Sequence, residues 1–261
     1  MKVVVSSIFR KFGALHFFDT LRFYFIFIKT IKSRKAFKQS YPNIKLPPDY
    51  LLYESYKLNY EKYYFEGKET AQWLVNTISK HTELSDKNIL DWGCGPARIV
   101  RHLPEILDGK CHIYGTDYNS QTIDWCRTNI QNVSFHNNGL EASLDFDTNF
   151  FDVIYGISIF THLSEEKHYE WFKELTRVTK PGGILFLSTH GKSFLRLLNI
   201  GEQNAFNDGS IVVKGNTLEG HRTYAAFHPQ AFFRKLIGDN QVVEFIEGNN
   251  YEQDVWIIKK K

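Results

Sequence analysis

One stretch, residues 88–98, limits what this chain can fold into more than any other part of its 261 residues. It reads Asn-Ile-Leu-Asp-Trp-Gly-Cys-Gly-Pro-Ala-Arg, which predicts the end of a short buried strand followed by a glycine turn. Gly93 and Gly95 allow a turn whose backbone N–H groups approach a ligand. A helix is expected to begin near Pro96 or Ala97. Together, the strand, the turn and the helix start indicate a site of nucleotide size.

A carboxylate beside this turn distinguishes it from a dinucleotide site. Asp91 lies two residues before Gly93. A pyrophosphate would be repelled there, whereas a ligand that presents an ammonium group would be attracted. S-adenosylmethionine is such a ligand, since it carries an ammonium, a sulfonium, a ribose diol and an adenine.

Several separate motifs resemble those of the class I S-adenosylmethionine-dependent methyltransferases. They are Leu90-Asp91-Trp92-Gly93-Cys94-Gly95, Gly115-Thr116-Asp117-Tyr118, Phe151-Asp152-Val153-Ile154, Ser158-Ile159-Phe160-Thr161-His162-Leu163 and Lys180-Pro181-Gly182-Gly183. The resemblance implies a methyltransferase domain over residues 46–261, with S-adenosylmethionine as cofactor. It implies an α/β fold, a Rossmann-like doubly wound sheet of about seven strands with an antiparallel strand near the C-terminus. Residues 1–45 would be an N-terminal helical extension.

The cofactor residues follow from the strand ends and from the resemblance. Asp117 ends a predicted strand over 112–117, where its carboxylate can accept hydrogen bonds from both ribose hydroxyls. The alternative is that Asp117 caps the next helix, although Asn119 and Ser120 are adequate caps. Relatives often carry an acidic residue where this chain has Gly139, so Asn138 is expected to accept from the adenine amino group instead. The complete predicted set is Asp91, Gly93, Gly95, Asp117, Tyr118, Asn138, Leu140 and Gly156.

Histidines supply the candidate general bases. His162 follows a predicted strand over 151–157, at the edge where ligands bind open α/β sheets. Its alternative role is to orient the loop before a helix that Ser164 caps. A long insertion, residues 192–227, is expected to form a β-hairpin from 210–214 and 221–227 and to cap the acceptor side of the site. The predicted catalytic residues are His162, His190 and His228, and His221, Arg222 and Tyr224 fall in the same insertion.

The N-terminal forty residues are basic and apolar at once. Residues 1–50 hold ten Lys or Arg against two Asp, a net charge of +8, so the rest of the chain carries −5 of the total of +3. Apolar residues recur there at roughly helical spacing, at Ile8, Phe9, Phe12, Leu15, Phe18, Leu21, Phe25 and Ile28. One interpretation is an amphipathic helix on an anionic membrane surface. The other, which we favour, is a helix packed on the catalytic domain or on a second subunit.

A linker with Pro42, Pro47 and Pro48 leads into a tyrosine-rich segment over 50–64. Such a stripe is more often packing than a binding surface, and Tyr63 and Tyr64 are its pocket candidates. A helix over about 69–79 is expected to follow. Further helices are predicted up to Thr179 and over 232–237, with strands over 133–135, 184–188, 242–247 and 254–259.

Composition and motifs also narrow the partners. Cys94, Cys111 and Cys126 lack zinc spacing and suggest free thiols in a reducing cytoplasm, and no metal site is predicted. The expected acceptor is a small molecule or a glycan, methylated on oxygen or nitrogen and possibly in surface-polysaccharide biosynthesis, rather than a nucleic acid. The expected location is cytoplasmic, with peripheral contact at the inner face of the membrane or self-association through residues 1–40. The main alternative is a non-catalytic cofactor-binding partner or scaffold subunit, and Asp91 argues against an NAD-dependent oxidoreductase.

Overall fold

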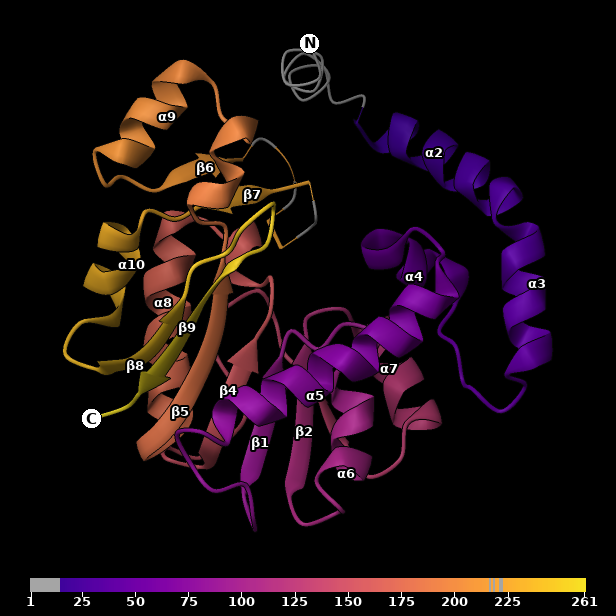
Figure 1. The fold of residues 1–261 in the computed structure, drawn as a ribbon, viewed down its shortest axis with the longest axis horizontal. Helices are drawn as coiled ribbons and strands as arrows, with labels where there is room; N and C mark the ends of the chain where they lie inside the picture. The colour runs from indigo at the N-terminus through magenta and orange to yellow at the C-terminus, as the bar shows by residue number, and fades with distance from the viewer. Residues whose placement is uncertain (1–14, 216, 218, 221–222) are drawn as a thin grey trace.

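The computed structural model describes residues 15–215, 217, 219–220 and 223–261. Its centre is a seven-stranded sheet in the order β3-β2-β1-β4-β5-β9-β8 (Figure 1). The strands are β1 (Asn88–Trp92), β2 (His112–Asp117), β3 (Ser134–Asn137), β4 (Phe151–Gly156), β5 (Thr179–Thr189), β8 (Gln241–Ile246) and β9 (Asp254–Lys259). β1 to β5 are parallel and β9 is antiparallel to both of its neighbours, which confirms the predicted fold class.

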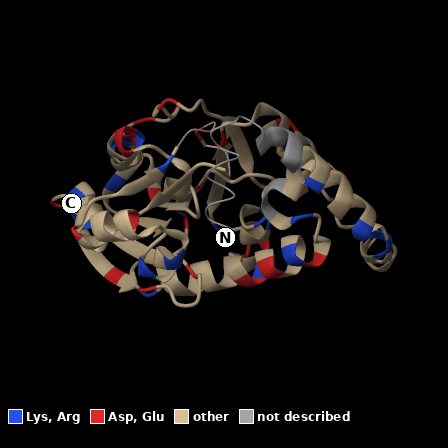
Figure 2. Ribbon diagram, turned by 90° about the horizontal axis from the view of Figure 1, so that it is seen from above, with Lys and Arg blue, Asp and Glu red and all other residues tan. Residues whose placement is uncertain are grey.

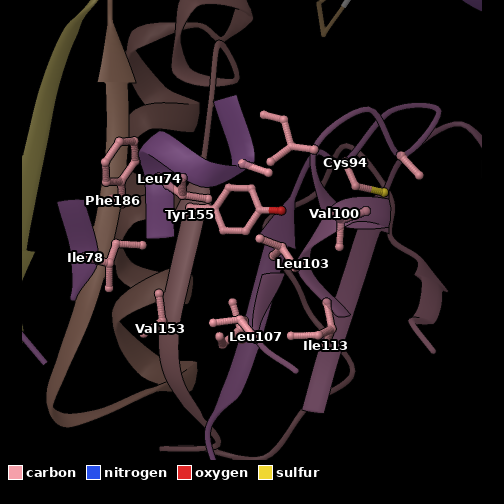
Figure 3. Close-up of a cluster of buried hydrophobic side chains, with 14 of the residues drawn as sticks. Leu74, Ile78, Cys94, Val100, Leu103, Leu107, Ile113, Val153, Tyr155 and Phe186 are labelled. Carbon is pink, nitrogen blue, oxygen red and sulfur yellow. The ribbon is translucent and has the colours of Figure 1, made fainter. Parts of the chain in front are cut away.

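Helices cover both faces of this sheet. On one face are α5 (Gly67–Ile78), α6 (Leu103–Ile106) and α7 (Ser120–Asn129), whose side chains Leu74, Leu103 and Ile123 belong to one buried cluster with Val153 and Tyr155 of β4 (Figure 3). On the other face are α8 (Glu165–Val178) and α10 (Gln230–Ile237). Their side chains form a second core with alternate residues of the same strands. Burial on both faces explains the nearly continuous apolar runs of the strands.

Two helices begin at residues whose side chains cap the first helical turn. Ser164 accepts a hydrogen bond from Lys167 N at the start of α8, and Asn119 accepts one from Thr122 N at the start of α7, so both predicted caps are confirmed. The predicted helix start near Pro96 or Ala97 is wrong. Ala97 has φ +59° and the first helical turn begins only at Val100, because the left-handed conformation at Ala97 is incompatible with a helix.

Several further boundaries differ from the prediction, that of β5 the most. β5 begins at Thr179 rather than at Ile184, so Pro181, Gly182 and Gly183 lie within the strand. The register between β4 and β5 shifts at this point, so Pro181 lies in an irregular part of the ladder, where a residue without an N–H is tolerated. The next residue, Gly182, donates its N–H to Lys260 O. α5 begins at Gly67, two residues earlier than predicted, after a π-helical turn over Lys62–Glu66.

The segment between β5 and α10 forms a small unit at the carboxyl end of the sheet. β6 (Val212–Lys214) and β7 (Ala225–Phe227) pair antiparallel, which confirms a hairpin in shorter form than predicted. α9 (Ile200–Asn207), which the sequence patterns did not indicate, packs Phe206 against Phe194 and Phe227. Two of the residues named above, His221 and Arg222, lie outside the described residues.

The N-terminal extension forms two helices, α2 (Leu15–Lys29) and α3 (Ile31–Ser40), followed by α4 (Asp49–Tyr56) (Figure 1). Phe23, Ile26 and Phe27 of α2 pack against a cluster that contains Phe37 and Tyr53. Three residues of the predicted buried stripe are instead exposed: Leu21, Phe25 and Ile28 are each at least half accessible to solvent. The predicted residues Ile8, Phe9 and Phe12 lie outside the described residues.

Candidate cofactor site

A cavity of about 420 Å³ opens where β1, β2 and β4 end. Polar groups reach it from three strand ends, and apolar groups come from α4 and from the loop after β3. The lining includes Leu51, Tyr56, Asp91, Gly93, Gly95, Arg98, Asp117, Tyr118, Asn138, Leu140, Ser158, His162 and Gly220. Seven of the eight predicted cofactor residues and one of the three predicted catalytic residues therefore share one cavity.

The glycine turn is held by its own amides. Gly93 N and Cys94 N each donate to Thr116 O at 2.8 Å, and Gly95 N donates to Asp117 Oδ2 at 2.9 Å. Pro96 has no N–H, and Ala97 N donates to Cys94 O. Every N–H from residue 93 to 97 is thus already bonded within the protein. The expectation that these amides face a ligand is wrong, and the turn does not offer the free donors that a pyrophosphate needs.

Glycine is required in this turn for two different reasons. Gly93 has φ +74°, and a Cβ there would lie 2.2 Å from Ile159 Cδ1, so a side chain would collide with the loop after β4. Gly95 has φ +49° and nothing within 4 Å of its Cβ position, so it leaves open space beside the cavity.

Asp91 supplies the strongest electrostatic feature of the cavity. It is the second-last residue of β1 and is only 4% exposed. Burial raises the pKa of its carboxyl to about 7, although Tyr155 and Arg98 beside it act in the opposite direction. Tyr155 extends from β4 toward β1 in Figure 3. A buried carboxylate that lines a cavity is costly unless a cation arrives to pair with it.

Asp117 is the last residue of the neighbouring strand β2, two residues beyond Gly115, which is the register partner of Asp91. Its Oδ2 accepts from Gly95 N, and its Oδ1 accepts from Asn119 N at 2.9 Å. It therefore joins the glycine turn to the start of α7, while Asn119 caps that helix. Each carboxylate oxygen has two lone pairs and can accept more than one hydrogen bond.

Beyond Asp117, one edge of the cavity is lined by Tyr118, Asn138 and Leu140. Tyr118 is partly exposed, as a stacking platform must be. Asn138 Nδ2 donates to Gly139 O at 2.7 Å, whereas Asn138 Oδ1 is buried and has no hydrogen-bond donor among the described residues. Such an unsatisfied acceptor is uncommon in a folded protein, and it suits a ligand that brings a donor.

His162 is the predicted base that lines the cavity. Its Nδ1 lies 2.7 Å from Tyr224 O, and because a carbonyl can only accept, Nδ1 carries the proton and donates. The basic nitrogen of the neutral ring is therefore Nε2. His162 O also accepts from Gly220 N, so the insertion fixes the position of this residue.

Three predicted site residues do not line the cavity. His190 Nδ1 donates to Ala226 O at 3.0 Å, and His228 Nε2 lies 2.7 Å from His168 Nε2 in the protein interior. Gly156 lies beneath Trp92, where a Cβ would come within 2.6 Å of the indole ring. Each of these residues thus has a packing or hydrogen-bonding environment away from the cavity.

Sequence patterns missed several residues that do line it. Tyr56 and Leu51 come from α4, and the Arg98 guanidinium lies 5.2 Å from the centre of the Tyr56 ring. Tyr63, a predicted pocket candidate, is instead buried and donates from its hydroxyl to Pro96 O at 2.6 Å, behind the turn. Of these residues, only Arg98 could have been suggested by the sequence, because it follows Gly95 by three residues and is therefore close to the glycine turn.

Together these groups fit S-adenosylmethionine. A carboxylate and a guanidinium share one end of the cavity, and an unsatisfied amide oxygen lies near its aromatic edge. Among the described residues, no group of three or more His, Cys, Asp or Glu side chains is placed to hold a metal ion.

Comparison with known proteins gives the same assignment. Residues 89–183 match the model of a methyltransferase domain family. Residues 89–183 are therefore assigned to a methyltransferase domain, and the fold around them is that of the S-adenosylmethionine-dependent methyltransferases. This fold is similar to that of the magnesium protoporphyrin IX methyltransferase from Synechocystis PCC 6803 with bound S-adenosylhomocysteine, with a TM-score of 0.54 at 16% identity. That similarity covers 87% of this chain and 94% of the other.

Curated relatives of this methyltransferase domain have different acceptors in their names. A mitochondrial ubiquinone biosynthesis O-methyltransferase from Dictyostelium discoideum is 27% identical over 134 residues, covering 46% of this chain and 40% of that protein. A tRNA N(3)-methylcytidine methyltransferase from Schizosaccharomyces pombe is 24% identical over 196 residues, covering 66% of this chain and 61% of that protein. The chain therefore spans less than two thirds of the length of either relative.

Proposed function

We propose that this protein transfers the methyl group of S-adenosylmethionine to an oxygen or nitrogen of a small molecule or glycan. The observation that carries the proposal is the glycine turn: its amides are all bonded within the protein, and the buried Asp91 beside it lines the cavity. This arrangement favours a cationic ligand head and disfavours a phosphate.

Each part of the cofactor has a matching group in the cavity. Asp91 would hold the ammonium and Arg98 the carboxylate of the methionine portion. Asp117 would accept from the ribose hydroxyls, and Asn138 Oδ1 would accept from the adenine amino group. Tyr118 and Leu140 would bracket the adenine ring, while Gly93 and Gly95 let the chain turn without side chains in the way.

Once bound, this cofactor supplies a methyl group on a positively charged sulfur, so the electrophile is already activated. The task left to the protein is to align the acceptor and to exclude water. His162 Nε2 would accept the proton that the acceptor atom releases as it bonds to the methyl carbon. Because Nδ1–H is fixed on Tyr224 O, the ring presents the basic nitrogen in one defined tautomer.

Support for a small acceptor comes from the name of one relative. The cavity of about 420 Å³ lies in the range of small-molecule sites, and that volume is the cofactor's in this proposal. The name of the Dictyostelium relative indicates a small-molecule acceptor, whereas that of the Schizosaccharomyces relative indicates tRNA. A sugar of surface-polysaccharide biosynthesis stays within the proposed acceptor class. The proposal includes a reducing cytoplasm, which the three free thiols support.

Calorimetric titration with S-adenosylmethionine and S-adenosylhomocysteine tests the cofactor assignment. We expect the wild type to bind both, Asp91→Ala to lose binding, and the matched control Asp124→Ala, an exposed carboxylate on α7, to bind normally. NAD should not bind. A folded wild type that binds neither ligand would contradict the proposal.

Turnover is tested separately with radiolabelled cofactor, using sugar nucleotides, glycolipids and, as a competing class, tRNA. Cofactor binding with no methyl transfer to any acceptor would favour a scaffold subunit, and transfer to tRNA would replace the proposed acceptor class.

His162→Gln should lower kcat by about a hundredfold or more while the cofactor affinity stays unchanged, because a positioned general base contributes on that scale. The measurement is steady-state methyl transfer against pH beside calorimetry. An unchanged kcat would show that His162 only orients the loop before α8.

A further inference from the structure

The outward side of the N-terminal helices carries an apolar stripe that the proposed reaction does not use. Its members lie three or four residues apart on α2 and at the start of α3, so they share one face of the helix. Their exposed fractions lie between 47% and 68%, and they are Leu21, Tyr24, Phe25, Ile28 and Ile31.

The N-terminal helices do not use this stripe to pack on their own domain. The opposite face of α2 is already packed, with the rings of Phe23 and Tyr53 5.2 Å apart. Arg34 of α3 is buried, forms an ion pair with Asp49 and lies over Phe27 at 4.1 Å. The two helices are therefore anchored on α4 by one side, and the apolar stripe lies on the other.

Cations accompany the apolar stripe. Five Lys or Arg side chains on the same two helices are exposed, and no Asp or Glu occurs between residues 20 and 48. The exposed cations are Arg22, Lys29, Lys32, Lys35 and Lys38. Figure 2 shows blue positions along these two helices. The charge is concentrated here, because the chain beyond residue 50 is net negative.

We propose that the apolar stripe and its cations dock this protein on the surface of an anionic lipid bilayer. The large apolar side chains would enter the boundary between headgroups and acyl chains, and the lysines would contact the anionic headgroups. The contact would be peripheral, since no helix in the described part of the chain is long and apolar enough to cross a bilayer.

The charge pattern favours a bilayer over two other partners. A second copy of the chain would bring two sets of exposed cations together, and like charges oppose such a contact. A nucleic acid would satisfy the cations but would leave five large apolar side chains facing phosphates and water. An anionic bilayer satisfies both kinds of side chain at once.

Docking would also place the cavity with respect to the membrane. α2 packs on α4 through Phe23 and Tyr53, and α4 lines the cavity through Leu51 and Tyr56. α4 thus contacts the N-terminal helices and also lines the cofactor cavity. Figure 1 shows α4 between these helices and the rest of the domain. Provided that the proposed function holds, an acceptor carried by a lipid anchor is the class of substrate that this arrangement serves.

Vesicle flotation of the full chain tests the docking directly. The vesicles contain phosphatidylcholine alone or phosphatidylcholine mixed with phosphatidylglycerol. We expect wild type to float with the anionic vesicles, and to float less as salt rises, since salt screens the headgroup charge. It should not float with the neutral vesicles.

The variant pair isolates the apolar stripe. Phe25→Glu with Ile28→Glu should lower the affinity for anionic vesicles by at least about tenfold, because burial of one large apolar side chain is worth roughly that factor. Ile200→Glu is the matched control, since Ile200 is exposed on α9 away from the stripe. Lys32→Gln with Lys35→Gln should weaken binding mainly at low salt.

Several results would overturn the docking proposal. One is that the wild-type protein does not bind anionic vesicles. Another is that the Phe25→Glu, Ile28→Glu variant binds them as tightly as the wild type. Light scattering that shows a dimer lost in the stripe variant would assign the surface to a second copy instead. Retention of tRNA that depends on the stripe would assign it to RNA. Cofactor titration of the same variants keeps this outcome separate from the proposed function, because the stripe lies outside the cavity.

Discussion

Two aspartates lie within the last two residues of neighbouring parallel strands and face the same cavity, yet their surroundings differ completely. Asp117 at the end of β2 accepts two backbone N–H groups, one from the glycine turn and one from the start of α7. Asp91, the second-last residue of β1, is buried, and burial raises its pKa to about 7. The fold stabilises the first carboxylate through two backbone hydrogen bonds, whereas for the second the cost of burial outweighs the help of Tyr155 and Arg98 until a cationic ligand binds. A shared position at the strand ends therefore does not imply a shared role.

Replacing Asp91 should produce the largest effect on binding. Asp91→Asn removes the charge that attracts the cofactor ammonium, and we expect the Kd for S-adenosylmethionine to rise by about a hundredfold or more. The apo protein should not lose stability at pH 8, since wild type must ionise a buried carboxyl there. Calorimetry and chemical denaturation measure the two quantities. A variant that binds normally would contradict the contact between Asp91 and the ammonium, and one that loses both affinity and stability would place Asp91 in the same role as Asp117.

Replacing Asp117 should show the opposite balance. Asp117→Ala leaves Gly95 N and Asn119 N without acceptors, which should lower the free energy of unfolding by about 2–4 kcal/mol. Binding should weaken as well, because the glycine turn loses its link to α7. Urea denaturation of the apo protein measures the stability change. If stability stays at the wild-type value, the two hydrogen bonds do not support the turn.

Asn138 provides a smaller contrast at the adenine edge. Asn138→Ala should raise the Kd for S-adenosylmethionine by about three- to tenfold, since one neutral hydrogen bond contributes roughly 0.5–1.5 kcal/mol. The stability of the apo protein should change little, because the buried Oδ1 has no partner there to lose and the hydrogen bond from Nδ2 to Gly139 O is exposed to solvent. Equal Kd values for variant and wild type would show that the unsatisfied oxygen does not contact the ligand.

Much of the fold was predictable because local patterns determine it. The last strand, β9, has the predicted bounds over 254–259, and the caps Asn119 and Ser164 stand where their side chains can accept from the first helical turn. Strands buried on both faces appear in the sequence as apolar runs, and a glycine or an aspartate after such a run marks the end of the strand. The presence of one antiparallel strand near the C-terminus followed from the family resemblance rather than from any single pattern.

The parts that were not predictable depend on contacts between distant segments. The amides of the glycine turn are bonded to Thr116 and Asp117, more than twenty residues away, so the turn sequence alone suggested free donors. Tyr56 reaches the cavity because α4 lies across it, which no spacing in the sequence indicates. His190 and His228 gathered near the insertion in sequence, but their rings bond to Ala226 and His168 instead of lining the cavity.

The same limit applies to the N-terminal helices. Helical spacing correctly indicated an apolar face containing Leu21, Phe25 and Ile28, but it could not say which of two apolar faces the domain would cover. The packed face is the one with Phe23 and Phe27, because Tyr53 of α4 and the Arg34–Asp49 ion pair lie on that side.

The most direct test of the central claim is the pKa of the Asp91 carboxyl, measured by carbon NMR with and without S-adenosylhomocysteine. We expect a pKa of about 7 in the apo protein and a clear downward shift on binding, because the ligand ammonium favours the ionised form. The raised pKa of the apo protein also affects affinity. Below pH 7 binding should weaken by about tenfold per pH unit, because Asp91 must lose its proton before it can pair with the ammonium. An ordinary pKa near that of a free aspartate, or one that the ligand leaves unchanged, would contradict the claim that this carboxylate is held for a cation.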